Sequence, residues 1–418
     1  MNKVKTLVPK LRFPEFQSAG EWKMIPLNQL AARDKRKNRD EKIERVLTNS
    51  AEYGVMDQRD YFDKDIATQG KLDGYFVVEL GDYVYNPRIS ATAPVGPISK
   101  NNIATGVMSP LYTVFKFKDR NNDFYHHYFK TTGWHAYMRQ TSSTGARHDR
   151  MAIASDAFMV IPLPVASPEE QQKIADCLSS VDELMAAETR KLDALKTHKK
   201  GLMQQLFPRE GETQPRLRFH EFQEAGDWEA KSIGQLGEVV TGSTPSTVLP
   251  EYYGGDRLFV SPADISDGRF VEKTKTTLTA LGFGETRPIK ANSILFVCIG
   301  STIGKIAQNR HECATNQQIN SVIPNSNNSD GFVYYALSGI ADKIANLAGI
   351  QAVPIVNKSL FSSVELATPK LPEQKRIADC LSSLDETILA QSEKLEAFKT
   401  HKKGLMQQLF PSPEEVAA

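Results

Sequence analysis

IADCLSSVDELMAAETRKLDALKTHKKGLMQQLFP runs from Ile174 to Pro208, and IADCLSSLDETILAQSEKLEAFKTHKKGLMQQLFP runs from Ile377 to Pro411. The two stretches are identical at 26 of 35 positions, at a constant offset of 203 residues. A shorter repeat begins each half of the chain: Leu-Arg-Phe and Gly-Glu-Trp at 11–13 and 20–22, then Leu-Arg-Phe and Gly-Asp-Trp at 217–219 and 226–228. The sequences between these repeats hardly match. This organisation predicts two different surfaces on one symmetric frame.

The repeated stretches have the heptad pattern of long helices. Apolar residues recur at alternating steps of four and three for about five heptads, which is the coiled-coil signature. We expect the helix–helix seam to contain Ile174, Leu178, Val181, Met185, Leu192, Leu195, Leu202 and Leu206 in the first copy, and Ile377, Leu381, Leu384, Ile388, Leu395, Phe398, Leu405 and Leu409 in the second. Antiparallel packing of the two helices on each other is the simplest arrangement, and pairing with another protein's helices is the alternative.

The ends of both helices are marked in the sequence. Ser167 and Glu170, with a proline between them, predict an N-cap and a capping box, whereas Leu371 is a poorer cap for the second copy. Pro208 and Pro411 end the two helices. About 39 residues at 1.5 Å each make a helix of roughly 58 Å.

Polar residues interrupt the seam at matching places. Glu188 corresponds to Gln391, and Lys199 corresponds to Lys402. Polar seam residues can determine the register and the partner of a helix at some cost in stability. Alternatively, these side chains point outward where the partner helix ends.

The sequences between the repeats have the pattern of two mixed α/β domains with short strands and turns. We expect strands at 75–78, 83–85, 112–115, 293–299, 319–323 and 363–367, helices at 124–138 and 331–347, and an exposed helix face at 33–45. Residues 81–88 and 95–98 resemble 291–298 and 303–306, which predicts a shared fold with different loops. The expected boundaries are a first domain at 1–166, a first long helix at 167–208, a second domain at 209–370, a second long helix at 371–411, and a disordered tail at 412–418.

Composition limits the class of protein. The 418 residues include 51 Lys and Arg against 50 Asp and Glu, so the net charge of +1 does not indicate a protein that coats nucleic acid. Four cysteines without a Cys-x-x-Cys pair suit a reducing compartment. The N-terminus lacks the apolar core of a signal peptide, and no apolar run approaches the roughly 20 residues that span a bilayer. We therefore expect a soluble cytoplasmic protein.

No catalytic or metal-binding constellation is found. Gly300–Lys305 is one residue short of a phosphate-binding loop, and Ile306 follows where Ser or Thr is needed. Asn86-Pro87-Arg88 lacks the second proline and the aromatic residue of an amino-methyltransferase motif. The histidines near residue 127 lack partners at metal-ligand spacing. We expect no catalytic residue and no metal site.

Several loops could contact nucleic acid. Hydroxyls and arginines suit phosphate oxygens and guanine, and amides suit adenine. The loop at 141–150 is hydroxyl-rich, and 347–358 is the matching stretch of the second half. The candidate DNA-binding residues are Arg88, Lys100, Arg139, Arg147 and Arg150 in the first domain, and Thr241, Ser243, Thr244, Tyr253, Lys273, Lys305, Gln317, Gln318, Gln351 and Asn357 in the second. For each, an ordinary solvated surface is the alternative.

Taken together, the repeats resemble one known family over essentially the whole chain. The motifs are Pro-Lys-Leu-Arg-Phe-Pro-Glu-Phe at 9–16, Ile-Pro-Leu-Pro at 161–164 leading into Glu-Gln at 170–171, Thr-Gly-Ser-Thr-Pro at 241–245, 300–305, Asn-Gln-Gln at 316–318, and Lys-Leu-Pro-Glu-Gln at 370–374. In order and spacing, the chain resembles the specificity subunit of type I restriction–modification systems.

The resemblance implies an α+β fold: two mixed α/β target recognition domains separated by two long antiparallel coiled-coil helices, with a pseudo-twofold internal repeat. Each domain would read half of a split site in double-stranded DNA, and the helices would set the length of the unread spacer. The implied partners are two modification subunits that methylate adenine with S-adenosylmethionine and two restriction subunits that cleave DNA with ATP and Mg. No cofactor is expected in this chain and no contact with a membrane.

Two other functions are compatible with parts of the sequence. A tandem coiled-coil scaffold that binds only proteins would use the same helices. A self-contained nuclease or methyltransferase would need catalytic motifs that the sequence lacks.

Overall fold

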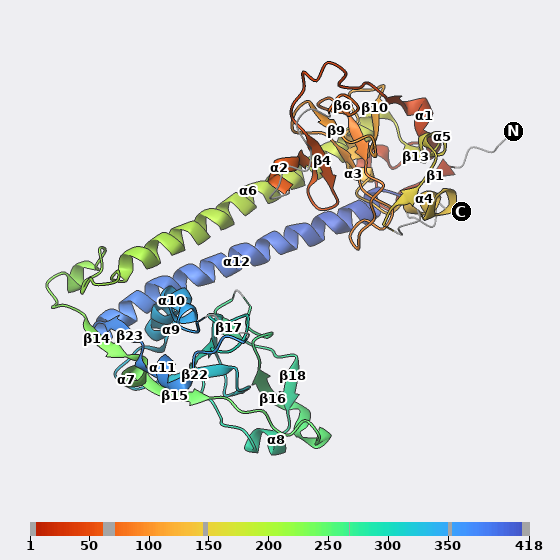
Figure 1. Cartoon of the computed structure of the whole chain (residues 1–418). Coiled ribbons are helices and arrows are strands. Elements are labelled where there is room, and N and C mark those ends of the chain that lie inside the picture. The colour runs from red at the N-terminus through yellow and green to blue at the C-terminus, as the bar shows by residue number, and fades with distance from the viewer. Residues whose placement is uncertain (1–5, 62–71, 145–148, 267, 350–352, 412–418) are drawn as a thin grey trace. The chain divides into compact units, whose positions relative to one another are not determined.

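A computed structural model describes residues 6–61, 72–144, 149–266, 268–349 and 353–411. The chain divides into two compact units (Figure 1). The first unit contains Met1–Ala187 and Leu395–Ala418, and the second contains Glu188–Lys394. The tail expected at 412–418 and the candidates Arg147 and Gln351 lie outside the described residues.

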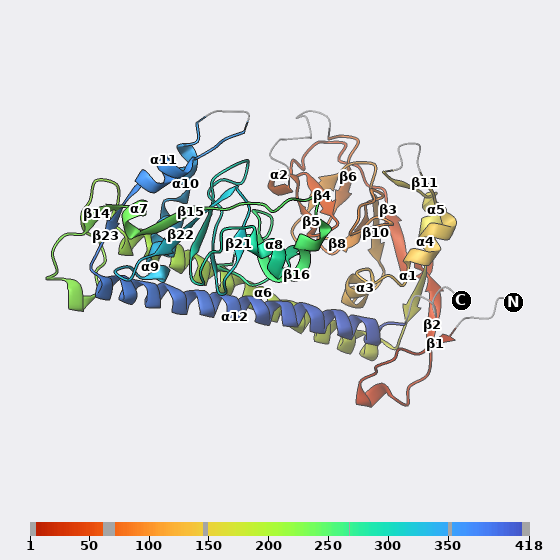
Figure 2. The ribbon, with the colours of Figure 1, turned by 90° about the horizontal axis from the view of Figure 1, so that it is seen from below.

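Two long helices, α6 (Pro168–Leu206) and α12 (Leu371–Leu409), each contain 39 residues. They lie side by side and antiparallel, as the heptad pattern predicts (Figures 1 and 2). Each unit holds the first part of one helix and the last part of the other. The first domain (residues 6–166) and the second domain (209–370) therefore each pack on segments from both repeats.

The seam residues are buried or half-buried in both helices. Ile174 and Leu178 join Leu409 in the core of the first unit. Ile377 and Leu381 join Leu206 in the core of the second unit. One apolar stripe thus serves both helix pairing and domain packing.

The polar seam residues pair between the helices. Lys402, only 8% exposed, donates to Asp182 in the first unit. In the second unit, Lys199 lies 2.5 Å from Asp385. The alternative that these lysines point outward is wrong, because each is held by a carboxylate of the other helix.

Glu188 and Gln391 are repeat equivalents that face each other. The Gln391 amide donates to the Glu188 carboxylate at 2.5 Å and to the Glu188 carbonyl at 3.1 Å. Lys394 also donates to Glu188, at 2.5 Å. Residue 188 of the first repeat thus meets its own counterpart in the second repeat.

The first domain is built on a four-stranded antiparallel sheet in the order β3-β10-β7-β8. Its strands are β1 (Thr6–Leu7), β2 (Trp22–Pro26), β3 (Ala31–Asp34), β4 (Leu47–Ser50), β5 (Gly54–Asp57), β6 (Phe76–Val78), β7 (Tyr83–Tyr85), β8 (Ile98–Lys100), β9 (Gly106–Met108), β10 (Thr113–Phe117), β11 (Ser143–Thr144), β12 (Met151–Ala152) and β13 (Pro162–Val165). Its helices are η1 (Pro14–Phe16), α1 (Leu27–Leu30), α2 (Gln58–Tyr61), α3 (Asp123–Tyr128), α4 (His135–Thr141) and α5 (Ser155–Met159).

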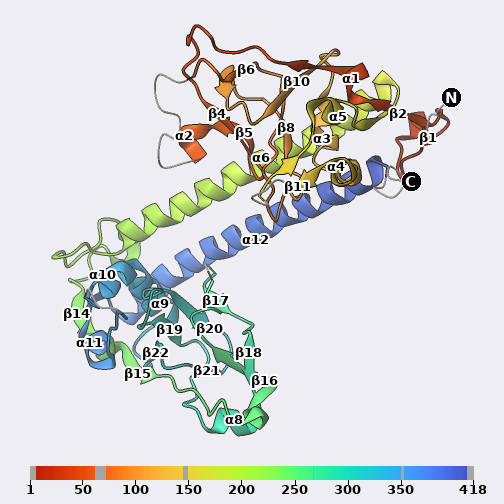
Figure 3. The same ribbon diagram turned by 45° about the vertical axis from the view of Figure 1, so that its right-hand side comes forward.

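The second domain repeats this order as β15-β22-β19-β20 and adds β17 beside β20 (Figure 3). Its strands are β14 (Glu229–Ser232), β15 (Gly237–Thr241), β16 (Tyr253–Val260), β17 (Phe270–Val271), β18 (Thr276–Leu278), β19 (Ile294–Val297), β20 (Ile306–Asn309), β21 (Ala314–Thr315), β22 (Ile319–Pro324) and β23 (Glu365–Thr368). Its helices are η2 (His220–Phe222), α7 (Ile233–Leu236), η3 (Pro250–Tyr252), α8 (Ala280–Gly284), α9 (Asp330–Gly339), α10 (Ala341–Asn346) and α11 (Lys358–Ser363).

A buried asparagine closes the central hairpin in both domains. The Asn101 amide lies within 3.5 Å of three backbone carbonyls, and so does that of Asn309. The backbone N–H of Gly81 donates to the Asn101 carbonyl, and the N–H of Asn292 donates to that of Asn309. Gly81 therefore corresponds to Asn292 rather than to Ala291, which corrects the expected alignment by one residue. Both residues have positive φ, 91° and 63°, which glycine and asparagine tolerate best.

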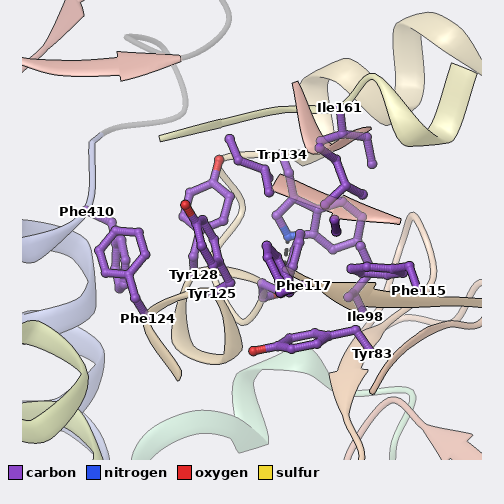
Figure 4. Packing of buried hydrophobic residues seen from close by; sticks show 14 of the residues in the cluster. Tyr83, Ile98, Phe115, Phe117, Phe124, Tyr125, Tyr128, Trp134, Ile161 and Phe410 are labelled. Atoms are coloured by element: carbon purple, nitrogen blue, oxygen red, sulfur yellow. Dashed lines mark hydrogen bonds between the residues drawn. The ribbon is translucent and has the colours of Figure 1, made fainter. Parts of the chain in front are cut away.

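Aromatic side chains fill the core of the first unit, and Phe410, directly after α12, joins them (Figure 4). Its ring centroid lies 5.1 Å from Phe124 and 5.7 Å from Tyr128. The repeat equivalent Phe207 stacks on Phe332 at 5.5 Å in the second unit. The Leu-Phe-Pro sequence at the end of α12 thus closes the core of the first unit, and the one at the end of α6 closes the core of the second.

A buried carboxylate ties the short N-terminal repeat to each long helix. Arg12 donates to Glu170 at 2.7 and 2.5 Å, and the Trp22 indole donates to it at 3.0 Å. Arg218 and Trp228 bind Glu373 in the same way, at 2.8 Å for both guanidinium contacts and 3.3 Å for the indole.

The prediction of a capping box is therefore wrong for the Glu170 side chain, which binds Arg12 instead of the N-cap backbone. The Ser167 hydroxyl does accept the Glu170 backbone N–H, at 3.2 Å. The Glu170 carboxylate, however, is 1% exposed and is taken by Arg12. A charge-assisted bidentate pair is stronger than the neutral contact to the N-cap backbone.

Three expected helices differ in the structure. The helix expected at 124–138 is split into α3 and α4, because the turn between them places Trp134 in the core, where its indole donates to the Phe129 carbonyl at 3.1 Å. The helix at 331–347 is split into α9 and α10 at Ile340. Residues 33–45 form no helix: the stretch begins in β3, and the Asn38 side chain then bonds the Ile43 backbone at both ends of its amide.

Replacement of Gln391 by Glu should destabilise the helix pair. Two carboxylates would meet where the structure has a hydrogen bond to a charged group, so we expect a lower urea midpoint. Glu188→Gln is the matched comparison, because it places two neutral amides opposite each other, loses only the ion pair with the half-exposed Lys394 and should cost less. Urea unfolding should show that the double exchange Glu188→Gln/Gln391→Glu recovers most of the loss; equal stabilities for all variants would refute the pairing.

Glu170→Ala should destabilise the first unit by about 3–5 kcal/mol, since it leaves the Arg12 guanidinium buried without its partner. Hydrogen exchange should accelerate in β2 and in the first turns of α6. Glu373→Ala should produce the same effect in β14 and at the start of α12. The exposed neighbour Glu169→Ala is the control and should change neither region.

Candidate nucleic-acid interface

One pair of loop segments has the same backbone hydrogen bonds in both domains. In the first domain, the Ile89 N–H donates to the Asp149 carbonyl at 3.0 Å, and the Met151 N–H donates to that of Pro87 at 2.9 Å. These bonds place Arg88 opposite Arg150 in an antiparallel bridge. We call Arg88 and Arg150 the loop pair of the first domain.

The second domain repeats this arrangement with different side chains. The Gly300 N–H donates to the Pro354 carbonyl at 3.0 Å, and the Val356 N–H donates to that of Cys298 at 2.8 Å. Ile299 and Ile355 face each other in the corresponding bridge and form the loop pair of the second domain. The backbone is repeated while the side chains change from cationic to aliphatic.

The loop pair of the first domain borders a cavity of about 290 Å³. Asn49 lines the cavity, is 2% exposed and donates to the Val84 carbonyl at 2.8 Å. Its Oδ1 atom has no partner among the described residues. Tyr112 also lines the cavity, with its hydroxyl 3.1 Å from Thr48. The lining beside the two arginines thus includes a buried amide oxygen and a tyrosine ring.

In the second domain, the 241–245 loop and the 316–318 loop form one surface. The Thr241 hydroxyl donates to Asn320 at 2.7 Å, and the Thr244 hydroxyl donates to Gln317 at 2.6 Å. The Tyr253 hydroxyl donates to the Pro245 carbonyl at 2.8 Å. Gly242 is required between the loops, because a Cβ there would lie 2.2 Å from the Asn316 carbonyl oxygen.

Gln318 connects this surface to the loop pair of the second domain. The side-chain amide of Gln318 donates to the Ile299 carbonyl at 3.3 Å, and the backbone carbonyl of Gln318 accepts from the Cys298 N–H at 2.8 Å. The structure therefore brings together five predicted residues with Ile299 and Ile355; these five are Thr241, Thr244, Tyr253, Gln317 and Gln318. Ser243 lies among them, with a hydroxyl that has no partner within the described part of the chain.

Other predicted residues are placed elsewhere or are already engaged. Lys100, 11% exposed, pairs with Asp123 at 2.7 Å. Asn357 caps α11 by accepting the Leu360 N–H at 2.9 Å. The Lys305 ammonium donates to the Ile265 carbonyl at 3.2 Å. Arg139 on α4 and Lys273 between β17 and β18 are exposed outside these loop surfaces.

Sequence reasoning missed Asn49, Asp149, Ile299 and Ile355. The two isoleucines were missed because only charged, amide and hydroxyl side chains were considered for DNA contact. The correspondence of 141–150 with 347–358 was the available signal, since Asp149 and Ile355 lie in these stretches.

Nothing in the described residues indicates catalysis or metal binding. No group of three or more His, Cys, Asp or Glu side chains there could hold a metal ion. Burial lowers the pKa of His127 to about 3, so this imidazole is neutral and packs with its Nε2 3.1 Å from Ser179 Oγ. Burial raises the pKa of Cys298 to about 12, which leaves an inert thiol. None of the helices in this part of the chain is long and apolar enough to cross a bilayer.

Comparison with known proteins identifies the family. The sequence model of the type I restriction modification DNA specificity domain matches residues 20–197 and again 225–398. The chain belongs to this family and has two target recognition domains, one in each half. The scaffold alternative has no support from these comparisons.

Individual relatives have similar descriptions. The HindI specificity subunit of Haemophilus influenzae is 35% identical over 147 residues, which cover 34% of this chain and 32% of that protein. The MjaIX specificity subunit of Methanocaldococcus jannaschii is 28% identical over 167 residues, or 39% of each protein. The matched region thus spans well under half of these relatives' length.

Solved structures show the same fold. The S subunit of a type I system from M. genitalium has a TM-score of 0.60 at 13% identity, with 97% of this chain and 100% of that chain covered. A chain from a study of type I complex assembly and conformational transition has a TM-score of 0.56 at 14% identity, with 94% and 98% covered.

Gly242→Ala should disrupt the loop surface of the second domain, because the added Cβ would collide with the Asn316 carbonyl. We expect a loss of about 1–3 kcal/mol and faster hydrogen exchange at 315–319. Gly284→Ala is the matched control, since no atom lies within 4 Å of its Cβ position. If both variants exchange at the wild-type rate, the 241–245 and 316–318 loops are not packed as described.

Proposed function

We propose that this chain is the sequence-specific DNA-binding subunit of a type I restriction–modification complex, and that each domain reads one half of a bipartite target. The observation that supports this most directly is the loop pair. Two copies of one backbone arrangement carry different side chains, as expected of two modules that bind the same kind of ligand and read different sequences.

We further propose that the partner subunits supply the chemistry. Modification subunits would bring S-adenosylmethionine and methylate adenine, and restriction subunits would bring ATP and Mg for cleavage. The neutral net charge of the chain, +1, supports a division of labour in which partners provide much of the attraction to phosphates. The complex would operate in the cytoplasm.

The long helices have a proposed role as a spacer. Both are 39 residues long and pair through residues at defined heights along the seam. A helix pair of fixed register suits a device that determines how many base pairs separate the two half-sites.

In cells that express this chain with its cognate modification subunit, adenine should be methylated in one bipartite motif. Sequencing that detects methylated adenine would identify the motif, and cells that express the modification subunit alone are the control. Exchange of residues 14–165 for the corresponding domain of another specificity subunit should change one half of the motif and leave the other half unchanged. An unchanged motif after the exchange would contradict the proposed function.

A further inference from the structure

The two loop pairs occupy one structural position with opposite chemistry. Each pair is held by two backbone hydrogen bonds of 2.8–3.0 Å, so the pairing itself does not depend on the side chains. In the first domain the pair carries two guanidinium groups. In the second it carries two branched aliphatic groups. Because the backbone accepts either kind of side chain at this position, the side chains there can differ according to the DNA sequence that each domain binds.

The arginine pair is better suited to a base edge than to phosphate. Asp149 lies 3.9 Å from Arg88 and 3.8 Å from Arg150. These separations are longer than hydrogen bonds, so the guanidinium donors remain available. The carboxylate nevertheless lowers the net charge of the three groups to +1, which weakens their attraction for a phosphate compared with two arginines alone. The attraction for a neutral acceptor pair, such as O6 and N7 of guanine, depends less on this net charge.

The exposure of the arginine pair agrees with this assignment. The Arg88 side chain is 60% exposed and that of Arg150 is 35% exposed. Arg36, in the same domain, is similarly exposed at 51% but differs in its partners, because its guanidinium is held by Asp34 at 2.6 Å and by Glu79 at 2.8 Å. Among the described residues, the loop pair thus retains donor capacity that Arg36 lacks.

The isoleucine pair lies beside a polar side chain, that of Gln318. Ile355 is 43% exposed, and Ile299 is half-buried opposite it. Gln318 holds the Ile299 carbonyl, so an amide side chain lies directly beside the aliphatic pair. Exposed aliphatic groups beside hydrogen-bonding groups fit the thymine methyl group, which projects into the major groove.

We propose that the loop pairs are specificity determinants: Arg88 and Arg150 read a guanine in the half-site of the first domain, and Ile299 and Ile355 contact a thymine methyl in the half-site of the second. This inference rests on the proposed function. It adds the base that each domain reads at this position and the groups that read it.

The test uses the full chain in complex with its modification subunit. DNA of the mapped motif is prepared with 7-deazaguanine in place of each guanine in turn, which removes the N7 acceptor, or with uracil in place of each thymine, which removes the methyl group. One guanine substitution should weaken binding by the wild type on the order of 10-fold, within the range of a lost bidentate contact. The same substitution should not weaken binding further for Arg88→Ala or Arg150→Ala. One uracil substitution in the other half-site should weaken wild-type binding and leave Ile355→Ala unaffected.

Arg120→Ala is the control, because Arg120 is an exposed arginine of the same domain, between β10 and α3 and outside the loop pair. It should retain the wild-type response to every substituted base. In mapped methylation, Arg88→Ala and Arg150→Ala should relax one guanine position and leave the other half-site strict.

The outcomes separate this inference from the proposed function. If the wild-type complex methylates no bipartite motif, the proposed function fails. If it does, and the arginine variants weaken binding equally on all sequences, the arginines contact phosphate and the inference is overturned. A first half-site without guanine, or a second without thymine, would also overturn it.

Discussion

The antiparallel pairing of α6 and α12 is the constraint on which the rest of the structure depends. Each domain packs on the beginning of one helix and the end of the other, so each core contains residues from both long helices. Leu409 and Phe410 belong to the core of the first unit, and Leu206 belongs to that of the second. This arrangement explains where the two helix sequences agree. Identity is complete over the first seven positions and the last thirteen, which contact the domains, and the differences fall between them.

The short N-terminal repeat follows from the same constraint. Arg12 and Arg218 each reach a glutamate in the first turn of a long helix, 158 and 155 residues further along the chain. A buried bidentate ion pair needs its partners at one position and in one orientation. The start of each domain is thereby attached to the start of a long helix. This attachment explains why the short N-terminal repeat is the same in both halves of the chain although the residues around it differ.

The parts of the fold that the sequence predicted are those determined by short-range pattern. The heptads of Ile174–Leu206 predicted the helices and their seam because burial repeats every three or four residues. The role of Glu170 was misjudged because its partner is distant in sequence, and the partner of Lys100 was not foreseen for the same reason. A local rule assigned Glu170 to a capping box, whereas Arg12 binds its carboxylate. Lys100 was a candidate for DNA contact, but Asp123 occupies its ammonium group. The pairing of Arg88 with Arg150 was beyond sequence pattern for the same reason.

The lack of sequence similarity between the two domains has a physical explanation. Most of the bonds that define the shared fold join backbone to backbone: the sheet strands, the central hairpin and the loop pair. Backbone hydrogen bonds do not depend on side-chain identity, so arginine can replace isoleucine in the loop pair without loss of the pairing. Special residues are needed only where the backbone is unusual or a side chain closes it, as at Gly81 and Asn292 or at Asn101 and Asn309. A scaffold of this kind lets recognition residues change freely while the frame stays the same, which is the property that a reader of variable sequences requires.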